Sequence, residues 1–243
     1  MDSLLGSSVI NKIAILQPNY IPWKGYFDLI AYVDHFVILD DVQFTKRDWR
    51  NRNLIKTSQG TQWITVPVIS KGKYDQKINE VLIDGNSWRQ EHLNSFKANY
   101  SRAKYFDQIY QLLEPIYLNE SIAFLSNFNL LLIETICVFL NIETKISLSS
   151  DLDLTKINKN ESLIEICNYF EARTYVSGPA ARNYLDITQF KAIGLDVEWF
   201  DYDGYNIYEQ LWGEFEHKVS ILDLLFNCGA NSSSFLRYPA TKR

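Results

Sequence analysis

Short apolar runs separated by polar loops predict alternating strands and helices in the N-terminal part of the chain. Lys12–Leu16 and Phe36–Leu39 are apolar runs of strand length, and each ends at polar residues that favour a loop. Between them, Trp23–Val33 carries apolar residues at helical spacing, and Pro22 suits a first helical turn. A strand, a helix and a second strand in this order are typical of a βαβ unit and therefore of a parallel sheet.

The middle of the chain predicts a helical block, and the C-terminal part returns to alternation. Residues 87–140 predict three helices, broken near Arg102 and at Asn119-Glu120. Further strands are predicted at Trp63–Val68, Val81–Ile83, Ile146–Leu148, Thr174–Ser177 and Val197–Phe200, and further helices at Ser162–Phe170 and Phe215–Phe226.

No linker rich in Pro, Gly or Ser divides the chain, so we expect one α/β domain over residues 1–243. Its predicted parts are an N-terminal βαβ part (12–85), a helical segment (86–141), a C-terminal α/β part (142–229) and a tail (230–243). The expected fold class is α/β, with a Rossmann-like, mainly parallel sheet and an inserted helical segment.

Composition narrows the class of protein. The chain is 47% hydrophobic and 22% charged, which is typical of a soluble globular protein, and its net charge of −5 does not favour duplex nucleic acid. The three cysteines show neither metal-site spacing nor an even count, so we expect a reducing, cytoplasmic location. Residues 121–140 are apolar, but Glu134 and other polar residues interrupt them, which predicts a buried helix and no membrane span.

The first candidate site follows the first predicted strand, where open α/β sheets place their ligands. Its sequence is Gln17-Pro-Asn-Tyr-Ile-Pro-Trp-Lys-Gly-Tyr26. Gln17, Asn19 and Lys24 supply hydrogen-bond donors near the start of a helix, which favours an anion such as phosphate. The alternative is a rigid loop whose aromatic residues, Trp23 and Tyr26, belong to the core.

The second candidate site is Asp40-Asp41-Val42-Gln43-Phe44, at the end of the next predicted strand. Paired carboxylates in this position can bind Mg²⁺, accept hydrogen bonds from sugar hydroxyls or act as a general base. Adjacent side chains point to opposite faces of an extended segment, so only one of the two carboxylates is expected to face a ligand. A turn or a helix cap explains the pair equally well.

The third candidate site is a basic run with interleaved aromatic and amide residues. Lys46, Arg47, Arg50, Arg52 and Lys56 lie within eleven positions of an acidic chain. The run also contains Trp49, Asn51 and Asn53. Arginine matches phosphate geometry and tryptophan offers a stacking surface, as a site for single-stranded nucleic acid also would. Because this one patch has no basic support elsewhere in the chain, it favours a nucleoside diphosphate. The alternative is a solvated charged surface.

The fourth candidate site is a predicted strand that ends in a Gly-containing turn, with Ser177, Gly178, Arg182 and Tyr184 available to a ligand. No two of the three histidines, His35, His92 and His217, have the spacing of metal ligands, so no metal is predicted. The cysteines lie in apolar contexts and are assigned to the core.

These motifs resemble the WbqC-like protein family over about residues 12–229. The resemblance rests on the Gln17–Phe27 motif, on Asp40-Asp-Val-Gln-Phe-Thr-Lys, on Trp49-Arg-Asn-Arg-Asn and on Trp63-Ile-Thr-Val-Pro-Val. It implies a role in O-antigen and other surface-polysaccharide biosynthesis. For some members it implies transfer of an amino acid such as glycine onto an amino sugar.

We therefore predict an N-acyltransferase that acts on the amino group of a dTDP- or UDP-linked deoxyamino sugar. The acyl donor stays open among aminoacyl-tRNA, a carrier thioester and an ATP-activated amino acid. No cofactor is required by the sequence, and ATP is left open. The alternatives are an ATP-dependent adenylate-forming amide ligase and a non-catalytic sugar-nucleotide-binding accessory protein.

The predicted roles divide between catalysis and binding. Asp40 or Asp41 is expected to take a proton, and Lys24 and Asn19 are expected to stabilise the tetrahedral intermediate. The predicted substrate-binding residues are Gln17, Tyr20, Gln43, Lys46, Trp49, Arg50, Asn51, Arg52, Asn53, Ser177, Gly178, Arg182 and Tyr184.

Overall fold

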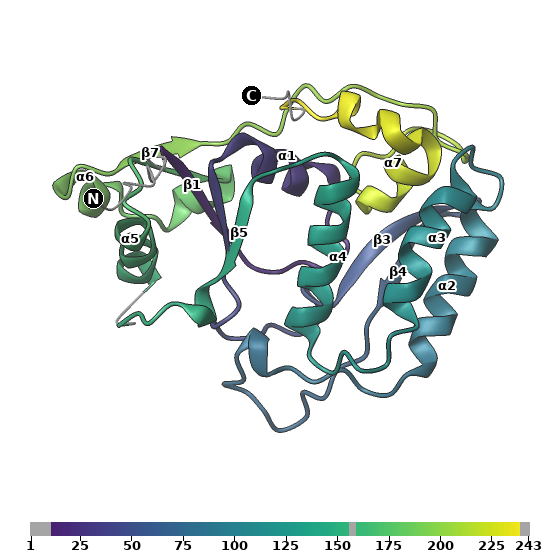
Figure 1. Ribbon diagram of the computed structural model, residues 1–243, viewed down its shortest axis with the longest axis horizontal. Coiled ribbons are helices and arrows are strands. Elements are labelled where there is room, and N and C mark those ends of the chain that lie inside the picture. The colour runs from purple at the N-terminus through teal and green to yellow at the C-terminus, as the bar shows by residue number, and fades with distance from the viewer. Residues whose placement is uncertain (1–10, 156–158, 239–243) are drawn as a thin grey trace, which may run out of the picture.

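The computed structural model describes residues 11–155 and 159–238 and contains a five-stranded, all-parallel sheet (Figure 1). The strands lie in the order β5-β2-β1-β6-β7, and every neighbouring pair is parallel. Their bounds are β1 (Lys12–Leu16), β2 (His35–Ile38), β5 (Lys145–Leu148), β6 (Thr174–Ser177) and β7 (Asp196–Trp199). The predicted α/β, Rossmann-like fold is thereby confirmed.

Alternate residues of the central strand β1 face two different hydrophobic clusters. Ala14 belongs to the cluster that contains Phe27 of helix α1 (Lys24–Tyr32), whereas Ile13 and Ile15 belong to the cluster that contains Leu163 of α5 (Lys159–Tyr169). Successive side chains of a strand point to opposite faces, so helices cover both faces of the sheet.

The direction in which the chain crosses the sheet reverses at β1. The chain passes from β1 through β2 to β5 on one side, then returns to β6 and β7 on the other side. In open α/β sheets, ligands bind beyond the carboxyl ends of the strands at such a reversal. The loop that follows β1 at residue 17 therefore starts at the position that the topology favours for a ligand.

Three helices form the predicted block: α2 (Ser87–Tyr100), α3 (Phe106–Tyr117) and α4 (Leu125–Phe139). They gather around an antiparallel hairpin, β3 (Arg52–Thr57) and β4 (Gly60–Thr65), on the side away from α5 and α6 (Ile187–Ala192) (Figure 1). Phe128, Leu132 and Ile136 of α4 are buried in the larger hydrophobic cluster, as expected for a core helix. None of the described helices has the length and apolar character needed to cross a bilayer.

Three local predictions differ from the structure. Val81–Ile83 forms no strand, because its backbone pairs only through isolated bridges, including Leu82 with Phe124. The strand predicted at Trp63–Val68 is shifted, since β4 ends at Thr65. The last helix, α7 (Ile221–Cys228), begins six residues later than predicted, where the Ser220 hydroxyl accepts a hydrogen bond from Leu222 N.

Candidate ligand-binding site

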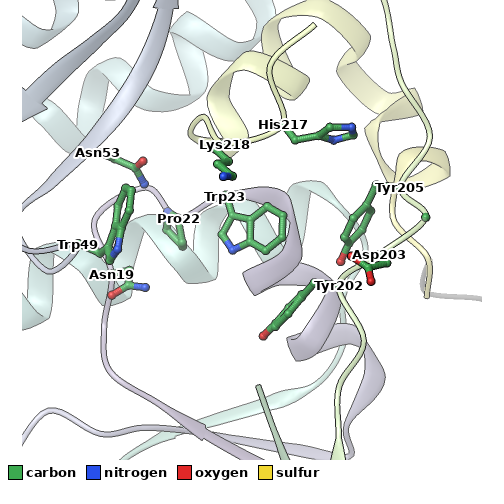
Figure 2. A pocket seen from close by; sticks show the side chains of 11 residues that line it. Asn19, Pro22, Trp23, Trp49, Asn53, Tyr202, Asp203, Tyr205, His217 and Lys218 are labelled. Atoms are coloured by element: carbon green, nitrogen blue, oxygen red, sulfur yellow. The ribbon is translucent and has the colours of Figure 1, made fainter. Parts of the chain in front are cut away.

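A pocket of about 580 Å³ lies between the loop after β1, the start of the hairpin and an irregular C-terminal segment. We call this segment, residues 200–220, the strap; it contains neither helix nor strand. Eleven residues line the pocket (Figure 2): Asn19, Pro22, Trp23, Trp49, Asn53, Tyr202, Asp203, Gly204, Tyr205, His217 and Lys218. A volume of this size falls in the range of about 300–1,000 Å³ that holds small-molecule ligands and cofactors.

Hydrogen bonds with Asn53 and Trp49 fix the loop after β1. The Asn53 amide donates to the carbonyl oxygens of Tyr20 (3.0 Å) and Ile21 (2.9 Å), and Tyr20 N donates to Trp49 O (2.8 Å). Ile21 has a φ of 35°, which is unfavourable for a β-branched residue and costs about 1–3 kcal/mol. Because Ile21 is fully buried and its carbonyl is bonded, the surrounding structure holds the loop in this one conformation.

The loop presents an amide and an indole to the pocket. Asn19 Oδ1 is buried and has no hydrogen-bond partner among the described residues, although Asn19 lines the pocket. The Trp23 ring packs against Tyr202 (centroids 5.3 Å apart) and Tyr205 (5.7 Å). A Cβ at Gly25 would lie 2.3 Å from the Trp23 indole, so glycine is required for the indole to fold back over the start of α1.

Buried polar contacts anchor the strap, which forms the opposite wall of the pocket. The Tyr205 hydroxyl donates to Asp28 Oδ2 (2.7 Å), and Lys24 Nζ donates to Asn206 O (3.1 Å). Further along, the Tyr208 hydroxyl donates to the buried Asp223 at 2.8 Å. Because these contacts hold a segment without secondary structure, the strap residues of the pocket have defined positions.

Lys24 lies behind this wall, in an aromatic cage. Its ammonium is 4.9 Å from the ring centroid of Tyr205, 5.4 Å from Tyr208 and 5.6 Å from Phe215. Only 3% of the residue is exposed, and burial lowers the pKa of Lys24 to about 8. Lys24 is absent from the pocket lining, so its contacts stabilise the strap.

His217 supplies a titratable group at the strap end of the pocket. Burial and the nearby positive charge of Lys24 lower the pKa of His217 below its ordinary value of 6.5. The imidazole is therefore neutral at pH 7 and able to accept a proton. Figure 2 shows His217, Tyr205 and Asp203 together at one end of the pocket, and Trp49 and Asn53 at the other.

The predicted carboxylate pair lies at the end of β2 and does not line the pocket. Asp40 accepts hydrogen bonds from Ser150 N (3.1 Å), Ser150 Oγ (2.9 Å) and Ser126 Oγ (3.3 Å). Asp41 accepts one from Ser149 Oγ at 2.5 Å. Both carboxylates are buried and join the end of β2 to the turn after β5. This arrangement corresponds to the turn or cap that the sequence left open.

Some residues of the basic run line the pocket, and others make contacts outside it. Trp49 and Asn53 line the pocket, whereas the buried Asn51 amide donates to Val66 O at 2.9 Å. Arg50 pairs with Asp48, and burial lowers the pKa of its guanidinium to about 10. Arg52 stacks on Trp63, with Cζ 4.2 Å from the ring centroid. Lys46 is exposed beyond the pocket lining and lies 5.8 Å from the Tyr74 ring.

The other predicted binding residues lie outside the lining of the pocket. Tyr20 is fully buried, with its hydroxyl 2.8 Å from His92 Nδ1, and the exposed Gln43 donates to Tyr74 O at 2.7 Å. Gln17 directly follows β1, and Ser177 and Gly178 lie at the end of β6, where Tyr202 covers Gly178. The Arg182 guanidinium lies over the Trp199 ring, and the Lys159 ammonium lies over the Tyr184 ring.

Comparison with known proteins agrees with this arrangement of motifs. The sequence profile of the WbqC-like protein family matches residues 17–235. The chain belongs to the WbqC-like family. It is also 55% identical over 229 residues to the "Uncharacterized protein Rv1507c" of Mycobacterium tuberculosis, which covers 94% of this chain and 99% of that protein. No solved structure matches the chain.

Sequence reasoning missed most of the pocket wall that the strap contributes to this WbqC-like protein. Tyr202, Asp203, Tyr205 and Lys218 all line the pocket, yet they lie in a segment without helical or strand periodicity. The available signal was the aromatic run Asp201-Tyr-Asp-Gly-Tyr205, whose large side chains had no predicted element to pack on. Among the described residues, no group of three His, Cys, Asp or Glu side chains could hold a metal ion.

Proposed function

We propose that this WbqC-like protein binds a dTDP- or UDP-linked amino sugar in the pocket and transfers an acyl group, with glycine as the candidate, to the sugar's amino group. One observation carries the proposal. Asn19, Pro22, Trp23, Trp49 and Asn53 come from two of the motifs on which the family resemblance rests, and all five line the same pocket. Residues from two family motifs therefore converge on one ligand-sized space.

The lining suits a sugar nucleotide. Indole and phenol rings pack against the flat faces of sugars and bases, and Trp23, Trp49, Tyr202 and Tyr205 supply such rings. Lys218 attracts a diphosphate. A buried oxygen without a partner costs about 1–3 kcal/mol, and a ligand hydroxyl or ammonium that donates to Asn19 Oδ1 would remove this cost.

The proposed reaction requires one proton acceptor in the pocket. The sugar ammonium first releases one proton to solvent, and the neutral amine then attacks the acyl carbon and forms a C–N bond. The bond to the donor's leaving group breaks when the tetrahedral intermediate collapses, and the leaving group takes the electron pair of that bond. The attacking nitrogen loses its second proton during this sequence. We assign that proton to the neutral imidazole of His217, because His217 lines the pocket and has a lowered pKa.

The general-base role of Asp40 or Asp41 stays a prediction, and their positions outside the lining support it less well than His217. The cage around Lys24 likewise supports an anchoring role more strongly than contact with the intermediate. Asn19 keeps its predicted place beside the reacting groups, because it lines the pocket.

Ligand binding tests the first part of the proposal. A ligand that binds only the folded state stabilises it by about 2.7 kcal/mol at 100 times Kd, which gives a measurable rise in Tm. UDP- and dTDP-linked amino sugars are expected to raise Tm more than the free sugars do. Trp49→Ala should reduce this rise, while Tyr169→Ala, at an exposed position on α5, should leave it unchanged. Equal, negligible responses to all these ligands would overturn the proposal.

Product analysis tests the second part. The protein is incubated with the amino-sugar nucleotide and, in separate reactions, glycyl-tRNA, a glycyl thioester, or glycine with ATP. Mass spectrometry is expected to detect the added glycyl group with one of these donors. Pyrophosphate exchange that requires ATP and glycine would instead identify the ligase. Tight binding of the sugar nucleotide without turnover of any donor would identify the accessory protein.

A further inference from the structure

Near the start of β3, one face of the β3–β4 hairpin carries a surface that continues the pocket. Leu54 pairs with Trp63 and Arg52 pairs with Thr65, so these four side chains lie on one face, while Ile55 and Ile64 are buried on the other. Trp63 is 43% exposed and its ring lies 5.2 Å from that of Trp49, which is 42% exposed and lines the pocket. Two adjacent exposed indoles at the mouth of a pocket indicate a binding surface.

This surface is positively charged. The Arg52 guanidinium stacks on Trp63, and within the described residues neither a carboxylate nor any hydrogen-bond acceptor pairs with it. Lys218 adds a positive charge to the adjoining pocket, and the chain two residues later is bonded to the hairpin, since Ser220 N donates to Leu54 O at 2.8 Å. An aromatic ring beside an unpaired guanidinium matches a base that is attached to phosphate.

The opposite end of the pocket carries the opposite charge. Asp203 lies there with Tyr202, Tyr205 and His217, away from Trp49 (Figure 2). An amino-sugar nucleotide has the same asymmetry, since its diphosphate is negative and its amine is positive when protonated. The charges of the pocket and of the ligand match in only one orientation.

We propose that Trp63 and Arg52 extend the pocket into a subsite for the base and diphosphate, so that the amino sugar lies between Asp203 and His217. This inference rests on the proposed function and adds the direction in which the ligand lies. It also places the reacting amine next to His217, which the proposed proton transfer requires.

Calorimetric titrations with UDP, a UDP-linked amino sugar and the free amino sugar test the orientation. Loss of base stacking typically weakens binding by roughly 5- to 100-fold. Trp63→Ala should therefore weaken UDP and the UDP-linked amino sugar by the same factor within that range. Trp63→Phe keeps an aromatic ring and should retain most of the wild-type affinity. Such a result would show that the loss in Trp63→Ala comes from the missing ring.

Asp203→Asn tests the sugar end. It should leave the Kd of UDP unchanged and weaken the UDP-linked amino sugar by about 10-fold, the usual effect of losing one charge-assisted hydrogen bond. Asp153→Asn is the matched control, because Asp153 is exposed and outside the pocket lining.

Two results would overturn the orientation while leaving the proposed function intact: Trp63→Ala that binds UDP as tightly as the wild type does, or Asp203→Asn that weakens UDP and the sugar nucleotide equally. A wild-type protein that binds neither the UDP-linked nor the dTDP-linked amino sugar would overturn both proposals.

Discussion

Polar residues follow two neighbouring strands of the same sheet, and they differ in how their hydrogen bonds are satisfied. After β2, the carboxylate of Asp40 accepts hydrogen bonds from Ser126 and from both the backbone and the side chain of Ser150. After β1, Asn19 presents a buried oxygen that has no partner among the described residues, in a pocket lined by aromatic rings. Asp40 and Asn19 both lie at the carboxyl edge of the sheet, but only the Asp40 carboxylate accepts hydrogen bonds from the surrounding residues.

The difference points to different roles for Asp40 and Asn19. A buried carboxylate with several donors is stabilised by the fold and has few lone pairs left for a ligand. A buried amide oxygen without a partner lowers the stability of the ligand-free protein, and only a ligand or water can offset that cost. Asp40 therefore joins the end of β2 to the turn after β5, and the edge beyond β1 holds the binding site that we propose.

The largest expected effect concerns catalysis. His217→Gln should lower kcat by about 10²–10⁴-fold, the usual contribution of a positioned general base, while changing ligand affinity only a few fold. Asp41→Asn should leave kcat near that of the wild type, because Asp41 lies outside the pocket lining. The kcat of both variants is measured by steady-state kinetics with the acyl donor that supports turnover. The opposite pattern would place the reaction at the end of β2.

The pH profile sharpens this result. Because the pKa of His217 is lowered, its imidazole loses its proton below pH 6.5, and activity that depends on the neutral ring should persist below that pH in the wild type. An acid limb centred above pH 6.5 would contradict the assignment of His217 as the base.

The next effect concerns stability. Asp40→Ala removes the hydrogen bonds that the carboxylate accepts from Ser126, Ser149 and Ser150, and it should lower the free energy of unfolding by about 3 kcal/mol, measured by urea denaturation. The Kd of the sugar nucleotide should stay within a few fold of the wild-type value. Asp153→Ala, at an exposed carboxylate three residues after Ser150, should change stability by less than about 0.5 kcal/mol. A stable Asp40→Ala protein that loses its ligand would remove the distinction between the two edges.

Periodicity predicted the frame of the fold because it reports directly on burial. The apolar runs at β1 and β2 and the helical spacing of α4 were visible in the sequence, since those residues are buried in the hydrophobic clusters. Of the hairpin, only β4 was predicted from the sequence, with shifted bounds. Lys56 is buried in β3 because its ammonium bonds to Gln210 Oε1 at 2.6 Å, and no local pattern reveals such a distant partner.

The pocket lining was predicted only in part, because local sequence patterns do not reveal contacts between distant residues. Asn19, Trp49 and Asn53 belong to compact motifs and were selected from the sequence, and they line the pocket. The strap was missed because tertiary contacts position it, such as the bond between Tyr205 and Asp28, 177 residues apart. Asp40 and Asn19 also show that residue type and position alone do not reveal which polar groups the fold satisfies.

A smaller effect is expected at Lys24, whose buried amine should make the free energy of unfolding depend on pH. The unfolded chain keeps the Lys24 proton up to the ordinary pKa of 10.5, whereas the folded protein releases it near pH 8. Above pH 8 the unfolded state therefore binds more protons, so this group makes the free energy of unfolding rise with pH, by at most about 1.4 kcal/mol per unit.

Denaturation of the wild type and Lys24→Met between pH 7 and pH 10 isolates this contribution. The wild type should gain stability relative to Lys24→Met as the pH rises from 8 to 10, and Lys191→Met, an exposed lysine of α6, should track the wild type. Parallel curves for the wild type and Lys24→Met would mean that the amine is solvated and available to the pocket.

The smallest expected effect compares two asparagines that both line the pocket, Asn19 and Asn53. Asn53 bonds to two loop carbonyls and accepts from Leu54 N at 2.7 Å, so Asn53→Ala should destabilise the fold by about 2 kcal/mol. Asn19→Ala removes an oxygen without a partner, so urea denaturation should show no loss of stability. Its cost should appear only in calorimetry, as a Kd about 5-fold weaker for the sugar nucleotide, which corresponds to about 1 kcal/mol for one hydrogen bond. The opposite result would be an Asn19→Ala protein that is destabilised as much as Asn53→Ala and binds the ligand as the wild type does. Asn19 would then be a structural residue like Asp40, and the β1 edge would lose the unpaired polar group that supports it as the binding site.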